Sequence, residues 1–490
     1  MPLRSLIKYL LAALLVAQLS GQRSEAQYAN TYYYMFGVPQ ANQLNPAFQP
    51  GCNGYLGVPF LAPVRFQVES NSITYGDVIQ WNPGLDRNVT FMHPYGDKDK
   101  FLNALQPSNR IRSELATSIF SLGWRKDAWF FTIDLNERLV EGITFPKDLA
   151  ELLIYGNLRQ SEFKLSEMNQ ELKYFHQFAI GASYNMDDEI QVGVRAKLML
   201  GGSNLVTENS LLNLKTSLDE WKFQSDIGVN VSIPYLEDIP VDQDGYLDMD
   251  SLANAGTDLL FNFPGKLADL WSPTGLSTLT GIKNPGFAID LGFNYFPIEK
   301  LSFSASVVDL GFIRWRNYVW NFHQEANYSF TGLEFKLDDN FSAADALLDS
   351  LKEEMKIKVT RDPYTTMLAG KIYLGAAYNL TEKVRFGAVF RTRIYNYKFY
   401  NQYTISANVQ PISMFSASLS YSIYGNSYTN LGLGLSLRLG PLNVFFITDQ
   451  APSAYLWPED FTALNFRFGL NIVWGCTALP RAMKDRPLID

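Results

Sequence analysis

Charged side chains, cysteines and long apolar runs are all scarce in this sequence, and the first and last of these shortages each exclude a class of protein. Only 18% of the 490 residues are charged, and the net charge of −8 comes without a basic cluster, which argues against a nucleic-acid partner. After the N-terminal segment, no stretch approaches the roughly 18 to 20 continuous apolar residues of a membrane-spanning helix. Any later membrane crossing must therefore be made by strands.

The sequence also lacks the motifs of an active site or a cofactor site. The three histidines, His93, His176 and His323, are far apart and have no metal-ligand spacing. There is no nucleophile elbow, no glycine loop for phosphate and no paired-carboxylate motif. We therefore expect no catalytic residue, no metal and no cofactor, and predict that the protein is not an enzyme. A hydrolase assembled from scattered residues of a barrel is the weakest alternative.

The first 26 residues have the pattern of a secretory signal peptide. Arg4 and Lys8 form a basic start, and Tyr9–Leu19 forms an apolar core. Small residues at Ser24 and Ala26 place the expected cleavage before residue 27. We therefore expect an exported protein.

What the sequence does contain is a repeated alternation of apolar and polar residues. In Ala463–Gly475 every second residue is large and apolar, which indicates an extended strand with two unlike faces. The strand's eleven alternating residues, tilted by about 45°, rise about 26 Å, close to the apolar band of an outer membrane. Aromatic residues, at 14%, are frequent, as in a membrane barrel where only alternate residues face lipid.

The alternation recurs along the chain, and short turns alternate with long insertions, the two largest at 233–285 and 316–365. Outer-membrane barrels have short periplasmic turns and long extracellular loops, so we expect both termini in the periplasm and an even strand number. The sequence predicts an all-β fold, a transmembrane antiparallel β-barrel of about 14 strands, with up to about 16 counted. Two candidate strands are weak, the first one and one near Leu212–Ser217. Short helices are expected on the long loops, one of them at Pro146–Tyr155.

A barrel of this size leaves an aqueous lumen, so the apolar face should contact lipid and the polar face should line the lumen. Five basic residues fall on the expected lumen face: Arg385, Arg391, Arg393, Arg438 and Arg467. They either bias a pore toward anions or form ion pairs with lumen carboxylates.

Residues 27–54 are rich in aromatic, Asn, Gln and Pro residues and have no clean period. We expect this leader to lie at or in the barrel mouth, because Tyr32, Tyr33, Tyr34 and Phe36 in a free tail would be an association hazard; a partly ordered leader is the alternative. The barrel is expected to span 55–475, and a polar periplasmic tail 476–490, which either binds a partner or is disordered.

The two cysteines flank the expected barrel. Cys52 precedes the first candidate strand and Cys476 follows the last one. Those strands are neighbours in a closed barrel, so a disulfide across the seam is geometrically natural in an exported protein. Two unpaired thiols are the alternative.

Three short motifs carry a resemblance to a known family. Asp309-Leu310-Gly311-Phe312-Ile313-Arg314-Trp315, the Asn45-Pro46-Ala47 turn of the leader, and Gly475-Cys476 resemble an uncharacterised outer-membrane β-barrel family of the Bacteroidota. That family looks like the FadL and PorV superfamily. The resemblance covers essentially the whole mature chain and implies a 14-stranded barrel with the leader entering from the periplasm. Within it, Asn45, Pro46, Ala47, Asp309, Gly311 and Trp315 are the motif residues.

The resemblance implies two functions. FadL relatives pass hydrophobic molecules laterally into the membrane, so we expect a FadL-like outer-membrane channel or transporter for small hydrophobic molecules. PorV relatives act in type IX secretion, so the alternative is a non-enzymatic subunit or adaptor of a secretion or surface-protein complex. The expected partners are outer-membrane lipid, a hydrophobic small-molecule ligand and, for the alternative, proteins of such a complex.

Overall fold

A computed structural model describes residues 30–217, 220–234, 236, 239–248, 284–330, 356–395, 398–424, 427–456 and 459–476. The expected signal peptide, most of the expected tail and much of both large insertions lie outside these residues. Among the described residues, no helix has the length and apolar character needed to cross a membrane.

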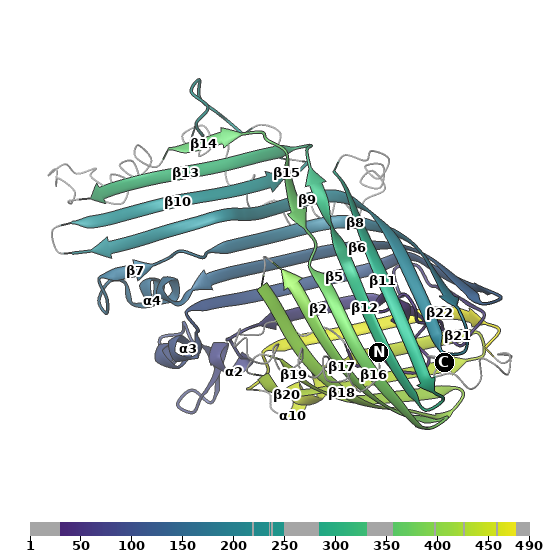
Figure 1. Ribbon diagram of the computed structural model, residues 1–490. Helices are drawn as coiled ribbons and strands as arrows, with labels where there is room; N and C mark the ends of the chain where they lie inside the picture. Colours follow the sequence, from purple (N-terminus) through teal and green to yellow (C-terminus); the bar gives the residue numbers. More distant parts are fainter. Residues whose placement is uncertain are drawn as a thin grey trace, which may run out of the picture.

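The chain forms a closed antiparallel barrel of 14 strands, as the sequence predicts (Figure 1). In order around the barrel they are β1 (Gly54–Gly57) with β2 (Val64–Ser70), β5 (Ser108–Lys126), β6 (Trp129–Pro146), β8 (Asn169–Asn185), β9 (Ile190–Thr216), β11 (Pro285–Ile298), β12 (Leu301–Trp315), β15 (Tyr364–Met367) with β16 (Gly370–Thr381), β17 (Val384–Tyr395), β18 (Lys398–Ile412), β19 (Phe415–Tyr424), β20 (Ser427–Leu439), β21 (Leu442–Thr448) and β22 (Ala463–Trp474). The last strand closes the sheet by pairing with both β1 and β2, with Gly54 opposite Trp474 and Val64 opposite Phe468.

Side chains along the strands alternate between an exposed apolar face and a buried polar face. In β22, Ile472 and Trp474 are exposed, whereas Asn465, Arg467 and Asn471 are buried. Exposed apolar side chains lie on strands all round the barrel: Ile111, Leu115, Phe178, Ile180, Val194, Phe287, Leu291, Phe293, Phe303, Leu310, Phe386, Ile405, Leu419, Leu435 and Phe446. This outer apolar belt is the face that a transmembrane barrel presents to lipid.

The sheet extends beyond the rim on one side, which the sequence did not predict. The first part of β9, Ile190–Leu200, pairs with β11. The second part, Asn204–Thr216, pairs with β10 (Trp221–Ser232). Beyond β10 lie β13 (Val319–Phe330) and β14 (Ile357–Thr360), so part of the range expected to be a loop insertion is strand. The expected weak strand near Leu212–Ser217 is the upper end of β9 and is not a separate strand. Figure 1 shows this extension as a flap standing out from the barrel.

The long connections carry the short helices and small hairpins. These elements are α2 (Tyr75–Val78), β3 (Ile79–Asn82), β4 (Arg87–Thr90), α3 (Lys98–Ala104), α4 (Lys147–Tyr155), β7 (Glu162–Lys164) and α10 (Ala451–Leu456). The predicted helix at Pro146–Tyr155 is α4, which begins after Pro146 and ends at Gly156, where φ is +64°. A backbone with positive φ favours glycine and terminates the helix.

Candidate functional site

Residues 30–50, called the plug below, lie inside the barrel. Nearly all of them are buried, including Tyr32, Tyr33, Tyr34 and Phe36, and a short 3₁₀-helix, η1 (Pro39–Gln43), runs through their middle. Burial removes the aromatic side chains from water, which was the physical reason for expecting the leader at or in the barrel. The segment lies within the lumen and not only at its mouth.

The wall holds the plug mainly through polar side chains that donate to the plug's backbone carbonyls. These bonds run from Ser306 to Leu44 (2.6 Å), Ser416 to Phe36 (2.7 Å), Ser418 to Thr31 (3.2 Å), Ser436 to Gly37 (2.8 Å) and Arg385 to Tyr34 (3.3 Å). Serine supplies a donor on a small side chain, so the plug backbone can approach the wall closely. The row of serines on the inner face of β19 thus acts as a docking surface for the plug.

The Asn45-Pro46-Ala47 turn lies against two wall glycines. Asn45 Nδ2 donates to Asn294 Oδ1 at 3.0 Å, and its Oδ1 accepts the amide N–H of Ala47 at 2.9 Å. A Cβ on Gly193 would overlap the backbone of Pro46, and a Cβ on Gly292 would overlap the Asn45 side chain. The turn motif is therefore a contact that requires bare backbone on β9 and β11.

An aromatic cluster fixes the other side of the plug. The Tyr33 ring lies 4.9 Å from Tyr34, 5.0 Å from Phe48 and 5.5 Å from Tyr373 of β16, centroid to centroid. Both Tyr33 and Tyr34 hydroxyls bond to Ser304 Oγ, at 3.1 and 2.7 Å. The plug is thus held both by an apolar core shared with the wall and by polar contacts.

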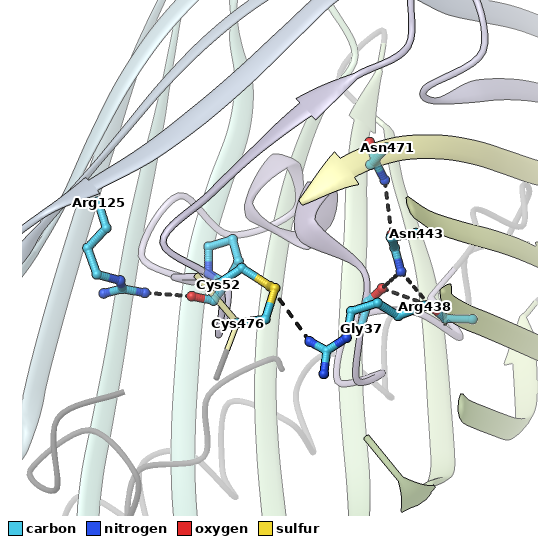
Figure 2. Close-up of a disulfide and its surroundings, with 9 residues drawn as sticks. Gly37, Cys52, Arg125, Arg438, Asn443, Asn471 and Cys476 are labelled. Carbon is cyan, nitrogen blue, oxygen red and sulfur yellow. Dashed lines mark hydrogen bonds between the residues drawn. A yellow bond between two sulfur atoms is a disulfide. The ribbon is translucent and has the colours of Figure 1, made fainter. Parts of the chain in front are cut away.

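A disulfide joins Cys52 to Cys476 next to the end of the plug, as Figure 2 shows. Arg125, near the end of β5, donates to the carbonyl of Pro50 at 2.5 Å. The disulfide links Cys52, two residues after the plug, to Cys476, two residues after the last strand. The C-terminal end of the plug is therefore covalently tied to the seam of the barrel.

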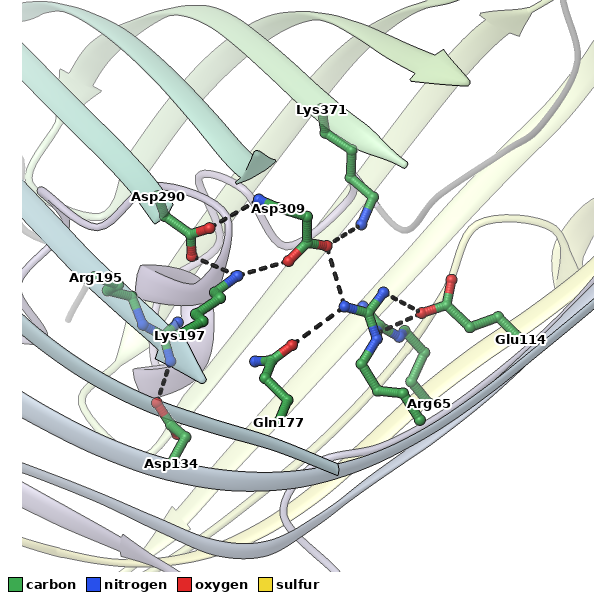
Figure 3. A network of polar contacts seen from close by, with 10 residues as sticks. Arg65, Glu114, Asp134, Gln177, Arg195, Lys197, Asp290, Asp309 and Lys371 are labelled. Carbon is green, nitrogen blue, oxygen red and sulfur yellow. Dashed lines mark hydrogen bonds and ion pairs between the residues drawn. The ribbon is translucent and has the colours of Figure 1, made fainter. Parts of the chain in front are cut away.

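An ion-pair network centred on Asp309 lies in the lumen (Figure 3). Its carboxylate accepts from Lys197 Nζ (2.6 Å), Lys371 Nζ (2.8 Å) and Arg138 Nη1 (3.1 Å), and its backbone N–H donates to Asp290 Oδ1 at 2.8 Å. All five residues are at least nine-tenths buried. Pairing offsets the high cost of burying such charges.

A bulge in β12 creates this network. Asp309 has a φ of +60°, and the register of β12 against β11 shifts at this point. As a result Val308 and Asp309 are both buried, and the residues that follow change face, so that Leu310 is exposed and Ile313 and Trp315 are buried. Aspartate tolerates positive φ better than most residues. The bulge therefore turns a carboxylate into the lumen beside three cations.

The other motif residues pack around the same strand. Trp315 is fully buried and donates from Nε1 to Thr366 Oγ1 at 2.9 Å. A Cβ on Gly311 would overlap the backbone of β11 at Phe287 and Ala288. Asp309, Gly311 and Trp315 thus shape one stretch of β12, the first by charge and the others by packing.

The structure places all five predicted lumen arginines on the inner face. Arg385, Arg391, Arg393 and Arg467 are buried, and Arg438 is partly buried at the end near the disulfide. Arg393 Nη1 lies 3.6 Å from Glu69 Oε1. Sequence reasoning named Asp309 but missed its partners Arg138, Lys197 and Lys371; alternation within β6, β9 and β16 would have placed these cations on the lumen face.

His176 lies on β8, His323 lies on β13, and His93 lies in the loop between β4 and α3. His176 Nδ1 lies 2.5 Å from Glu137 Oε1. In the part of the chain that the structure describes, no group of three or more His, Cys, Asp or Glu residues is placed to hold a metal.

A cavity of about 60 Å³ remains between the plug and the charged wall. The plug contributes Tyr32, Gln43 and Leu44 to its lining, and the wall contributes the charged residues Arg65, Arg138, Arg195, Lys197, Asp309, Lys371 and Arg467. The lumen therefore holds the plug, a charged wall and a small cavity between them.

Comparison with known proteins identifies a family whose function is unknown. The family model described as "Family of unknown function (DUF5723)" matches residues 46–449. No curated protein sequence matches the chain.

Among solved structures, the fold is similar to those of several membrane barrels. The Ralstonia pickettii toluene transporter TbuX is 7% identical with a TM-score of 0.43, covering 91% of this chain and 98% of that chain. The Pseudomonas putida toluene transporter TodX is 11% identical with a TM-score of 0.34, covering 92% and 94%. The translocator domain of autotransporter NalP from Neisseria meningitidis is 7% identical with a TM-score of 0.30, covering 86% and 88%. Identities this low carry no information about substrate.

Proposed function

Because this chain belongs to the DUF5723 family, whose function is unknown, we propose its function from the geometry of the barrel. The protein is an outer-membrane channel or transporter for small molecules, and the plug is its gate. The outer apolar belt supports the membrane location, because lipid is the solvent that such a belt requires. The end that carries the short turns and the disulfide faces the periplasm, in keeping with outer-membrane barrels in general.

The plug is the observation that carries the proposal. It occupies the lumen, yet many of its contacts with the wall are hydrogen bonds from Ser, Asn and Arg side chains to its backbone carbonyls. Such bonds exchange for bonds to water at a small net cost, about 1 kcal/mol each. These hydrogen bonds therefore add little to the cost of moving the plug within the lumen.

Small hydrophobic molecules are the proposed cargo. The aromatic cluster around Tyr33 gives the plug an apolar side against β16. On the opposite, outer side of the wall, an apolar hollow is lined by residues that include Ala376, Ala388, Ala407 and Leu419. The wall between the two is thin, because the inward-facing residues Gly375 and Gly387 lie directly against the Tyr34 ring.

Solute uptake tests the proposal. Outer-membrane vesicles with and without the full-length protein are compared for uptake of a small apolar dye and of a small neutral sugar. Faster dye uptake is expected. Faster uptake of the sugar alone would support a channel but contradict the apolar cargo. If neither solute enters faster with the protein than without it, the result would contradict transport. The alternative role as an adaptor of a secretion or surface complex has no contact among the described residues in its favour.

A further inference from the structure

We propose that the cavity between the plug and the wall binds a small oxyanion, such as phosphate or a short dicarboxylate, and that Arg467 is the centre of this site. Arg467 lies on β22 with 2% of its surface exposed, and it lines the cavity. Its guanidinium lies over the Tyr32 ring, 4.2 Å from the ring centroid. No carboxylate of the described residues lies within ion-pair distance of it, whereas the other cations of the cavity are all paired.

The charges around the cavity do not balance. Arg65 and Arg138 share Glu114, Arg195 pairs with Asp134, and Lys197 pairs with Asp290. Lys371, Lys197 and Arg138 also share Asp309. Five cations thus divide four carboxylates, and Arg467 is left over as a sixth cation. A buried excess of positive charge is costly and is relieved by an anion.

The cavity lining also carries donors without acceptors. Among the described residues, Arg467 Nε and Nη1, Tyr32 Oη and Gln43 Nε2 are buried and have no hydrogen-bond partner. Arg65 Nε and Arg195 Nε are in the same position. An oxyanion offers several acceptor lone pairs at once and so satisfies a ring of donors, as a carboxylate or phosphate does with arginine elsewhere.

The size of the cavity limits the ligand. A volume of about 60 Å³, at roughly 10 to 15 Å³ for each water-sized group, holds about four to six non-hydrogen atoms. That is the size of a phosphate ion or of one end of a short dicarboxylate. A long acyl chain does not fit in this space.

The site joins the gate to the wall. Tyr32 and Gln43 belong to the plug, whereas Arg467 and Arg65 belong to β22 and β2. A bound anion would therefore connect the two parts and hold the plug closed. This effect on gating rests on the proposed function, but binding of the anion does not.

Isothermal titration calorimetry on the full-length protein in detergent tests the site. Inorganic phosphate is the ligand in one arm and succinate in the other, both at constant ionic strength in chloride buffer. We expect saturable binding of at least one of the two, and at least tenfold weaker binding by Arg467→Gln, which removes the charge. Arg467→Lys is expected to bind with intermediate affinity, because it keeps the charge but loses the planar fork.

Arg438→Gln is the matched control, since it removes a lumen arginine that does not line this cavity. It should bind like the wild type. Absence of binding up to about 10 mM in both arms, or equal affinities for the wild type and Arg467→Gln, would overturn the proposal, the second result showing an adventitious ion only. Conductance in planar bilayers is recorded separately, so a protein that binds anions but forms no channel refutes the transport proposal alone.

Discussion

Arg467 and Arg65 lie directly opposite each other in the pairing of β22 with β2, but among the described residues only Arg65 has a carboxylate partner, Glu114, at 2.8 Å. Like charges in directly opposite positions of a sheet repel each other. The wall therefore stores unfavourable electrostatic energy at the point where it meets the plug.

Replacement of Arg467 by methionine should stabilise the barrel in the absence of phosphate and dicarboxylates. Methionine is unbranched and fills a similar space, and it removes an unpaired buried charge, so we expect a gain of about 1 to 2 kcal/mol. Urea unfolding in lipid vesicles measures it. Arg385→Met is the control, because Arg385 donates to Asn379 and to the carbonyl of Tyr34, and its loss should destabilise. A lower midpoint for Arg467→Met would contradict the unpaired state of this arginine.

Asp309→Asn should be strongly destabilising. The change keeps the shape and the tolerance of positive φ but leaves Lys197, Lys371 and Arg138 with one shared carboxylate fewer, at a cost of about 3 to 5 kcal/mol. The same unfolding assay measures it.

Asp99→Asn is the comparison for that variant, because Asp99 pairs with Arg159 on the surface. The hydrogen bond from Arg159 lowers the pKa of Asp99, but both side chains are exposed to solvent and no change in the midpoint is expected. Equal effects of the two substitutions would show that the Asp309 network adds nothing to stability.

Gly193→Ala should displace the plug and leave the barrel folded. The new Cβ would overlap the backbone of Pro46, and backbone atoms cannot turn aside as a flexible side chain can. We expect higher single-channel conductance in planar bilayers than for the wild type. In Gly142→Ala the nearest atom lies 3.8 Å from the new Cβ, so this variant should conduct like the wild type. Unchanged conductance in Gly193→Ala would argue against the plug as the gate.

Reduction of the disulfide should lower the stability of the folded chain. The bond between Cys52 and Cys476 closes a loop of most of the described chain, and loss of such a constraint costs about 2 to 5 kcal/mol. The fraction of folded protein that survives heating in SDS, with and without dithiothreitol, measures the effect. A Cys52→Ser/Cys476→Ser double variant should be insensitive to dithiothreitol, and sensitivity in that variant would point to another cause.

Ile405→Arg tests the lipid contact of the outer belt. Ile405 is 62% exposed on β18, and an arginine on the lipid face near the middle of the bilayer costs about 2 to 4 kcal/mol. Met92→Arg changes a residue that is 72% exposed but lies in a loop, and it should have no effect on unfolding in vesicles. If the two variants unfold alike, the belt does not face lipid.

The alternation of the strands determined much of this structure at the level of sequence. Lipid requires apolar side chains and water requires polar ones, so alternating residues such as Ile472 and Asn471 predict which face of the strand each side chain lies on. The lumen arginines could therefore be named from the sequence. The strand β13 escaped prediction because it lies beyond the rim of the barrel, where no single face has to be apolar. The bulge at Asp309, which reverses the faces of β12, is a backbone feature that the alternation only partly reveals.

The tertiary structure alone decided which charges are paired. Arg138 and Asp309 are 171 residues apart, and they meet only because the sheet closes into a barrel. The same closure places Tyr32 of the plug against Arg467, to which no carboxylate in the described part of the chain comes within ion-pair distance. Sequence sets the face of each side chain through local geometry, whereas partners across a lumen depend on the strand order and register of the whole barrel.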